Sequence, residues 1–146
     1  MIRITRLTDY GIVLLSQMAL SPERRFNAPD LASETSLPQP MVSKILKQLA
    51  RSGLLLSHRG VHGGYALSRS AESITVAEII TALEGPIAVT ECIEDGPGSC
   101  DKEASCPVQS NWRRINVAIR GALDGITLAE MTSPAPLKLV TLGGRR

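Results

Sequence analysis

The sequence predicts a mainly α-helical fold in which three short helices precede a two-stranded β-hairpin. Apolar residues recur at helical spacing from residue 8 to residue 52, with breaks at Ser21-Pro22-Glu23 and Leu37-Pro38-Gln39-Pro40. A short apolar run then leads into a glycine-rich turn at 59–64, and a second short run follows it. A hairpin placed directly after the third helix is the wing of a winged helix-turn-helix, which we predict for residues 1–84.

The boundaries of these elements follow from local signals. We expect helices at about 8–20, 28–36 and 40–52, with strands at 54–58 and 65–68. Thr8-Asp9 offers a start for the first helix, Asn27 is suited to cap the second, and Gly53 ends the third. In the third helix the inward positions are Val42, Ile45, Leu46 and Leu49, which leaves the polar and basic residues between them on the outside.

Two capping boxes organise the second half of the chain. Thr75-Val-Ala-Glu78 predicts the start of a helix that runs to about Leu83, and Thr127-Leu-Ala-Glu130 is a second capping box of the same pattern. Between them, glycines and prolines predict a long irregular loop at 85–105. A seam at 3-4-3-4 spacing then predicts a long helix that pairs with a second copy, through Trp112, Ile115, Ile119, Ala122 and Ile126. We therefore expect a cysteine-bearing loop at 85–108, a dimerisation helix and a short helix at 109–132, and a mobile tail at 133–146.

Composition and charge narrow the class of protein. Apolar residues make up 43% of the chain and aromatic residues 3%, so the core must be aliphatic. Residues 1–70 carry nine Lys and Arg against four Asp and Glu, whereas residues 71–110 carry one against eight, which indicates separate roles along the chain. With no run of 18 apolar residues and no cleavage signal, we expect a cytoplasmic protein without a membrane partner.

The third helix and the hairpin are candidates for binding double-stranded DNA. The second helix of a helix-turn-helix enters the major groove with its N-terminal residues at the base edges, here Gln39, Ser43 and Lys44. Lys47 and Arg51 follow where phosphates run beside the helix. In the wing, Arg59 can reach a narrow minor groove, with His62, Gly63 and Gly64 beside it. Basic residues on an outer helix face are often only solvated, but the hairpin with Arg59 in this place favours DNA binding.

The three cysteines suggest a second site. Cys92, Cys100 and Cys106 are separated by seven and five residues in an acidic, glycine-rich stretch, and their odd number argues against a disulfide framework. Thiolates this close can converge on an iron–sulfur cluster. Structural zinc prefers closer cysteine pairs and a fourth Cys or His, and both histidines lie in the wing. A redox thiol switch and three cysteines without a ligand also remain open from the spacing alone.

An enzyme is the least favoured class. The sequence has no glycine fingerprint for a nucleotide cofactor and no Ser, His and Asp arrangement typical of nucleophilic catalysis. We therefore expect neither an enzymatic activity nor a small-molecule substrate.

The chain resembles the Rrf-type winged-helix regulators of bacteria, the group that includes the cluster-sensing repressors IscR and NsrR, and within it the regulators of the Suf iron–sulfur assembly system. The resemblance covers residues 1 to about 132 and combines the wing with the cysteine triplet. Its motifs are Leu7-Thr8-Asp9-Tyr10, Val42–Leu54, Arg59-Gly60-Val61-His62-Gly63-Gly64-Tyr65, Ile74–Ile80, Cys92 with Cys100 and Cys106, and Ile126–Met131.

This resemblance implies a homodimeric repressor of iron–sulfur assembly genes whose cysteines hold a [2Fe-2S] or [4Fe-4S] cluster. In the IscR type a His three residues after the last Cys is the fourth ligand, but here Gln109 stands there. In the NsrR type an Asp in the first helix of the other subunit takes this role, which corresponds to Asp9. The resemblance therefore favours Asp9 of the partner subunit as fourth ligand, with Gln109, Glu91, Glu94 or a small molecule as alternatives.

A mechanism follows as an expectation. If the cysteine loop lies between the DNA-binding head and the dimerisation helix, ordering of this loop would fix the spacing of the two reading helices. Half-sites on one face of DNA lie about 34–36 Å apart, so a shift of a few ångströms would prevent both helices from docking.

Overall fold

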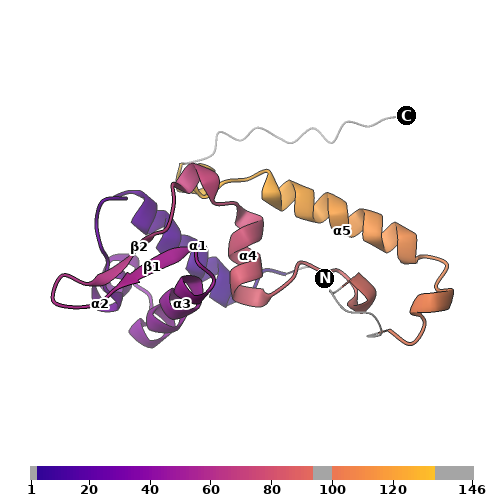
Figure 1. Cartoon of the computed structure of the whole chain (residues 1–146), viewed down its shortest axis with the longest axis horizontal. Coiled ribbons are helices and arrows are strands. Elements are labelled where there is room, and N and C mark those ends of the chain that lie inside the picture. Colours follow the sequence, from indigo (N-terminus) through magenta and orange to yellow (C-terminus); the bar gives the residue numbers. More distant parts are fainter. Residues whose placement is uncertain (1–2, 94–99, 134–146) are drawn as a thin grey trace.

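The computed structural model describes residues 3–93 and 100–133, which form a helical head with one long helix extending from it (Figure 1). The α-helices are α1 (Arg6–Ala19), α2 (Ala28–Thr35), α3 (Gln39–Arg51), α4 (Val76–Glu84), α5 (Gln109–Asp124) and α6 (Leu128–Thr132). An antiparallel hairpin is formed by β1 (Leu55–His58) and β2 (Gly64–Leu67). This is the predicted mainly helical winged helix-turn-helix. The predicted mobile tail lies outside the described residues, except for Ser133.

Local caps set the helix boundaries. The start of α1 differs from the prediction, because the N-cap is Thr5 rather than Thr8-Asp9: the Thr5 hydroxyl accepts a hydrogen bond from the backbone N–H of Thr8 at 3.3 Å. The predicted cap of α2 is confirmed, since Asn27 Oδ1 accepts from the N–H of Asp30 at 2.8 Å. Ser36 then adopts a left-handed conformation with φ of 56°, which turns the chain sharply into α3.

An aliphatic core holds the head together. The amphipathic pattern of α3 places Val42, Ile45, Leu46 and Leu49 in this core, as predicted. Other elements contribute fully buried side chains, namely Leu14, Leu15, Leu31, Leu55, Ile74, Ile79 and Leu128, with Phe26 as the one aromatic ring buried to the same extent in the described ranges. Burial of each such side chain contributes about 1.5–3 kcal/mol, so the core fixes the angle between α2 and α3.

The two capping boxes lie side by side in space. Thr75 and Thr127 form an antiparallel bridge, in which the N–H of Val76 donates to Ile126 O at 2.9 Å and the N–H of Leu128 to Ile74 O at 2.8 Å. The sequence motifs therefore pair reciprocally, although they lie some fifty residues apart. This pairing anchors the C-terminal end of α5 to the head.

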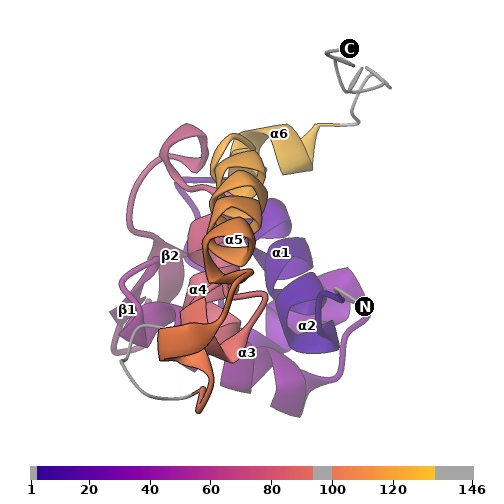
Figure 2. The same cartoon turned by 90° about the vertical axis from the view of Figure 1, so that its right-hand side faces the viewer.

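The long helix α5 stands apart from the head along most of its length. Figure 2 looks along α5 from its N-terminal end, with the head behind it. The predicted seam residues Trp112, Ile115 and Ile126 remain 40%, 42% and 40% exposed, and Asn116 is the only buried residue of this helix. Ile126 follows the end of α5 rather than lying within it.

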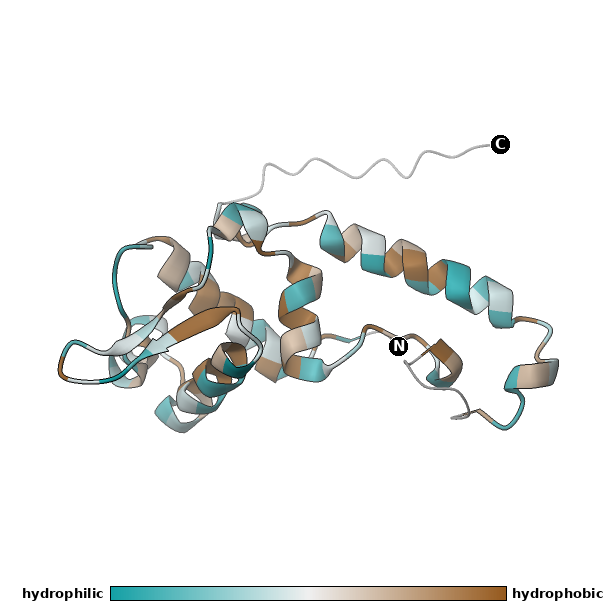
Figure 3. Ribbon diagram, viewed as in Figure 1, coloured by the Kyte–Doolittle hydropathy of each residue, from teal (hydrophilic) through white to brown (hydrophobic). Residues whose placement is uncertain are grey.

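Polar and apolar residues alternate along α5, without a long hydrophobic stretch (Figure 3). In the described ranges no helix is both long and apolar enough to span a lipid bilayer.

The stretch at 85–105 is not wholly irregular. Its described residues, 85–93 and 100–105, include single turns of 3₁₀ helix at η2 (Glu91–Ile93) and η3 (Glu103–Ser105), and a further 3₁₀ turn, η1 (Ala71–Ser73), precedes α4. The expectation of no regular structure in this stretch was therefore wrong, because three-residue turns need only one i to i+3 hydrogen bond, such as Ile93 N–H to Thr90 O at 3.1 Å.

Candidate nucleic-acid interface and cysteine segment

The outer face of α3 presents a basic surface. Lys44, Lys47 and Arg51 are exposed on it, and within the described ranges no carboxylate lies within 4 Å of any of them. A shallow groove of about 360 Å³ runs along this face and is lined by Pro40, Ser43, Lys44, Lys47, Gln48 and Arg51. Because no carboxylate of the described residues neutralises their charge, these side chains are available to phosphates.

Gln48, a polar residue of this face, connects α3 to α4. The Nε2 group of Gln48 donates to Ala82 O at 3.2 Å and to Leu83 O at 2.9 Å, two carbonyls in the last turn of α4. Gln48 therefore ties α3 to α4 and sets the orientation of the basic face. Gln39 is exposed at the first position of α3, whose N-terminus has no side-chain cap.

The wing projects from the head beside α3 (Figure 1), and Arg59 and His62 are both exposed in its turn. Its strands pair in register from Leu55 with Leu67 to His58 with Gly64. The predicted arrangement of a basic helix beside a basic turn is therefore present in the structure. Contact of these residues with DNA stays a prediction.

Gly63 and Gly64 have tertiary reasons to be glycine. A Cβ added at Gly63 would lie 2.3 Å from His58 O, and one at Gly64 would lie 2.7 Å from Phe26 O. Gly64 also has φ of 136°. These contacts explain both glycines from the fold itself, whatever their role at DNA.

A further strand-like contact supports the wing and was not predicted. The N–H of Phe26 donates to Tyr65 O at 2.9 Å and the N–H of Tyr65 donates to Phe26 O at 2.7 Å, which adds the chain before α2 to the hairpin. Next to it, Arg25 donates to His62 O at 3.2 Å. Arg25 thus holds the wing turn and adds a cation beside it. The pair Arg24-Arg25 was visible in the sequence, but its proximity to the wing depends on the fold.

The cysteine segment lies at the opposite end of the molecule from the wing (Figure 1). Cys92 is in η2, Cys100 follows the stretch that is not described, and Cys106 caps η3 just before α5. All three are free thiols of intermediate exposure. The expectation that this loop lies between the head and the dimerisation helix was wrong in space: it extends beyond the head, beside the N-terminal part of α5.

The three cysteines suit an iron–sulfur cluster in their chemistry but not in their positions within the described residues. Three free thiols on a short segment have the correct donor chemistry. Their positions do not converge, since in the described parts of the chain no three His, Cys, Asp or Glu side chains are grouped closely enough to hold a metal ion. The thiols are thus suitable ligands for a cluster, but the described residues of one subunit do not bring three such ligands together.

The candidate fourth ligands are dispersed. Asp9 is exposed in the first turn of α1 on the head. Gln109 donates from Nε2 to Glu103 Oε1 at 3.2 Å, so its amide already has a partner next to Cys106. Glu91 lies in η2 beside Cys92, and Glu94 lies outside the described residues.

Asn116 is a residue near this segment that the sequence reasoning missed. It is 7% exposed and binds the backbone before Cys92, donating to Ile87 O at 3.0 Å and accepting from the N–H of Val89 at 3.1 Å. The sequence gives no signal for this role of Asn116, because its partners lie 27 and 29 residues away.

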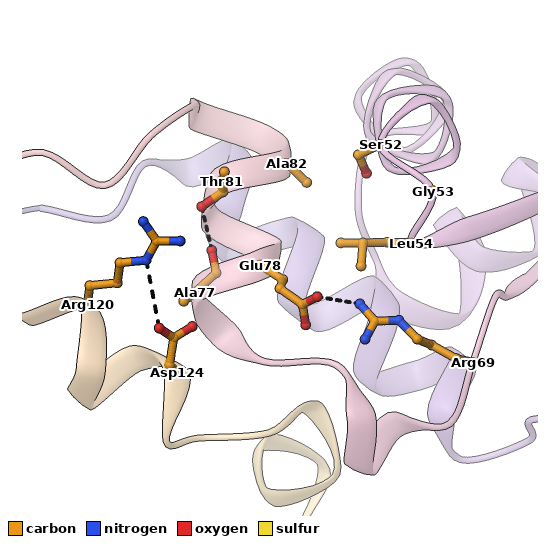
Figure 4. A pocket seen from close by; sticks show the side chains of 10 residues that line it. All are labelled: Ser52, Gly53, Leu54, Arg69, Ala77, Glu78, Thr81, Ala82, Arg120 and Asp124. Atoms are coloured by element: carbon orange, nitrogen blue, oxygen red, sulfur yellow. Dashed lines mark hydrogen bonds and ion pairs between the residues drawn. The ribbon is translucent and has the colours of Figure 1, made fainter. Parts of the chain in front are cut away.

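A cavity of about 420 Å³ lies between α4, α5 and the chain after α3 (Figure 4). Its cations are paired, Arg69 with Glu78 and Arg120 with Asp124. Burial by itself would raise the pKa of Glu78, but hydrogen bonds from Thr75 and Arg69 outweigh it and hold this pKa below its usual value. The charges lining this cavity thus neutralise one another.

Comparison with known proteins identifies relatives along almost the whole chain. The Rrf2 family, described as iron-dependent transcriptional regulators, matches residues 4–134. The HTH-type transcriptional regulator IscR of Klebsiella pneumoniae is 29% identical over 132 residues, which are 90% of this chain and 80% of that protein.

Two solved structures are similar in both fold and sequence. The structure of CymR, the global cysteine regulator of B. subtilis, has a TM-score of 0.67 at 28% identity and covers 90% of this chain and 97% of its own. The structure of T. potens IscR has a TM-score of 0.66 at 27% identity, covering 89% and 85% respectively. These relatives are regulators of transcription rather than enzymes.

Proposed function

Because the chain belongs to the Rrf2 family of transcriptional regulators, we propose that it is a homodimeric repressor that binds double-stranded DNA and responds to the state of its three cysteines. The basic face of α3 beside the wing, which no carboxylate in residues 3–93 and 100–133 neutralises, is the observation that carries this proposal. Gln39, Ser43 and Lys44 would contact base edges in the major groove. Such a protein acts in the cytoplasm, where the bacterial chromosome lies.

Separate contacts are expected from the helix and the wing. Lys47 and Arg51 would neutralise phosphates, which adds affinity for any sequence. Arg59 would enter a narrow minor groove, where A·T-rich DNA has its strongest negative potential. Arg25 supports this role, since it holds the backbone of the wing turn at His62.

Binding of variants to a duplex selected from a random pool, measured at several salt concentrations, tests these contacts. Lys47→Ala is expected to weaken binding to all sequences and to lower the slope of log affinity against log salt by about 2, because one phosphate contact is lost in each subunit of the dimer. Arg59→Ala is expected to cost about 1–3 kcal/mol, and chiefly on duplexes with A·T-rich flanks. The control is Arg113→Ala, an exposed cation on α5. Equal effects of all three substitutions would contradict the assigned interface.

We propose further that Cys92, Cys100 and Cys106 bind a [2Fe-2S] or [4Fe-4S] cluster, with Asp9 of the partner subunit as the fourth ligand. The donor chemistry of three free thiols supports this, as does the description of the family as iron-dependent. A cluster would supply a redox-sensitive link between these residues. Control of iron–sulfur assembly genes follows from the resemblance to Suf regulators and is part of the same proposal.

A metal-free thiol switch is the second candidate. It is favoured by the separated positions of the described cysteines and by the likeness to a global cysteine regulator. In this case oxidation of the thiols, rather than loss of a cluster, would change the affinity for DNA.

The visible absorbance and EPR spectra of the anaerobically reconstituted protein decide between these candidates. A cluster predicts bound iron and colour that are lost in Cys92→Ser, Cys100→Ser and Cys106→Ser. Asp9→Ala should yield a less stable cluster while the cluster-free dimer still binds DNA. A colourless protein whose DNA affinity changes with thiol oxidants would support the switch instead, and loss of the cluster in Gln109→Ala but not in Asp9→Ala would reassign the fourth ligand.

A further inference from the structure

Asn116 makes an unusual connection for a residue of an otherwise exposed helix. It is the one buried residue of α5, and both ends of its amide are used by backbone groups of the preceding segment, Ile87 O and Val89 N–H. Buried amide groups are costly to leave unpaired, so this pair of bonds fixes the segment to the helix.

We call the two hydrogen bonds between Asn116 and residues 87–89 the clamp. The clamped segment leads directly to a cysteine. Cys92 lies three residues beyond Val89, so even a fully extended chain keeps its Cα within about 11 Å of the clamp. The intervening residues are compact, with the N–H of Ile93 bonded to Thr90 O and the Thr90 hydroxyl 3.2 Å from Cys92 Sγ. The position of the Cys92 thiol therefore depends on Asn116.

The other end of the same segment is tied to the head. The Glu84 carboxylate accepts hydrogen bonds from Thr5 N–H at 3.1 Å, Thr5 Oγ1 at 2.7 Å and Thr8 Oγ1 at 2.5 Å, all at the start of α1. Residues 84–89 are thus held to α1 at one end and to α5 at the other. A cavity of about 350 Å³, which Ile80, Ile119 and Leu123 help to line, lies beside this segment and leaves room for it to shift.

We propose that Asn116 is a positioning residue that holds Cys92 against α5, so that a change at this thiol moves α5 relative to the head instead of being absorbed by a loose loop. The inference rests on the proposed function, since it supposes that the cysteines are the responsive group. It holds for either chemistry, whether Cys92 binds a cluster or is oxidised.

The rate at which Cys92 reacts with Ellman's reagent tests the clamp in metal-free protein. Cys92 is left as the single thiol by Cys100→Ser and Cys106→Ser, and Asn116→Asp or Asn116→Leu is added. Asp keeps the acceptor for Val89 but loses the donor to Ile87, whereas Leu loses both. We expect the reaction to be faster by about tenfold with Leu and at least as fast with Asp, because Leu loses both hydrogen bonds and Asp turns an oxygen toward Ile87 O, and both changes increase local opening.

Two controls separate positioning from general stability. Asn111→Asp changes an exposed Asn on the same helix and should leave the rate unchanged. In a second background with Cys106 as the single thiol, the Asn116 variants should have no effect. An unchanged Cys92 rate, or equal acceleration of both thiols, would overturn the inference.

Different results would overturn the proposed function and this inference. A wild-type protein that takes up no iron and whose DNA affinity ignores thiol oxidants overturns the proposed sensing, whereas the thiol rates still report on the clamp. Conversely, a wild-type protein that holds a cluster, with Cys92 rates unaffected by Asn116, would overturn the clamp alone.

Discussion

At the scale of single residues, the fold requires glycine in the wing for a reason that a sequence motif does not reveal. The sequence predicted that Gly63 and Gly64 lie beside Arg59 in a turn that contacts DNA. The structure adds that Gly64, with φ of 136°, lies against the backbone of Phe26, which pairs with Tyr65. A side chain there would separate the wing from the strand-like segment that supports it.

Gly64→Ala is therefore expected to destabilise the head. The positive φ and the contact with Phe26 O should lower the free energy of unfolding by about 1–3 kcal/mol or more. Thermal unfolding followed by circular dichroism measures this. Gly121→Ala is the matched control, because a Cβ at this position of α5 meets nothing within 4 Å and Ala favours a helix. An unchanged melting temperature for Gly64→Ala would show that the wing tolerates the shift.

At the scale of elements, helix ends are joined to one another by side chains. Glu84 ends α4 and receives three hydrogen bonds from the start of α1, where a carboxylate also complements the helix dipole. Burial alone would raise the pKa of Glu84, but the bonds from Thr8 and Thr5 outweigh it and hold this pKa below its usual value. The α1–α4 connection therefore depends on an ionised Glu84.

This connection predicts a pH dependence of stability. Because the pKa of Glu84 is lower in the folded than in the unfolded state, its contribution is complete above the unfolded value and is lost as the pH falls through the folded value. Glu84→Gln should remove part of the acid sensitivity below about pH 4.5 while costing less than about 1 kcal/mol at neutral pH, since the group is exposed. Unfolding in urea between pH 3 and 7 measures it, and parallel curves for both proteins would contradict it.

At the scale of the whole molecule, α5 combines a buried polar contact within its own chain with exposed apolar side chains. Asn116 faces the segment before Cys92, whereas Trp112 and Ile115 leave large apolar side chains exposed. Exposed apolar residues at heptad spacing on a helix that stands apart from its own head (Figure 1) support pairing with a second copy.

Ile115→Asp is accordingly expected to give monomers, because a charge would be placed in the apolar seam. Sedimentation or size-exclusion chromatography with light scattering measures the mass, and circular dichroism should show an intact head. Val117→Asp is a demanding control, since Val117 is 65% exposed on the opposite side of the same helix and should leave the dimer intact. A dimer that survives Ile115→Asp would place the interface elsewhere.

Much of the molecule follows from local pattern. The periodicity of α3, the Asn27 cap, each capping box and the glycine-rich turn predict the order of elements in the head, because each depends on residues within a few positions of one another. The start of α1 and the short turns near the cysteines were missed, since single hydrogen bonds decide them.

By itself the sequence determined the winged head, the basic outer face of α3 and the presence of three thiols near a long amphipathic helix. Only the tertiary structure decided that the cysteine segment lies far from the wing, that Asn116 and Glu84 hold the segment leading to it, and that Phe26 and Arg25 support the wing. The physical reason is the distance along the chain. Hydrogen bonds between residues 27 to 79 positions apart leave no periodic trace, whereas a buried helix face repeats every turn.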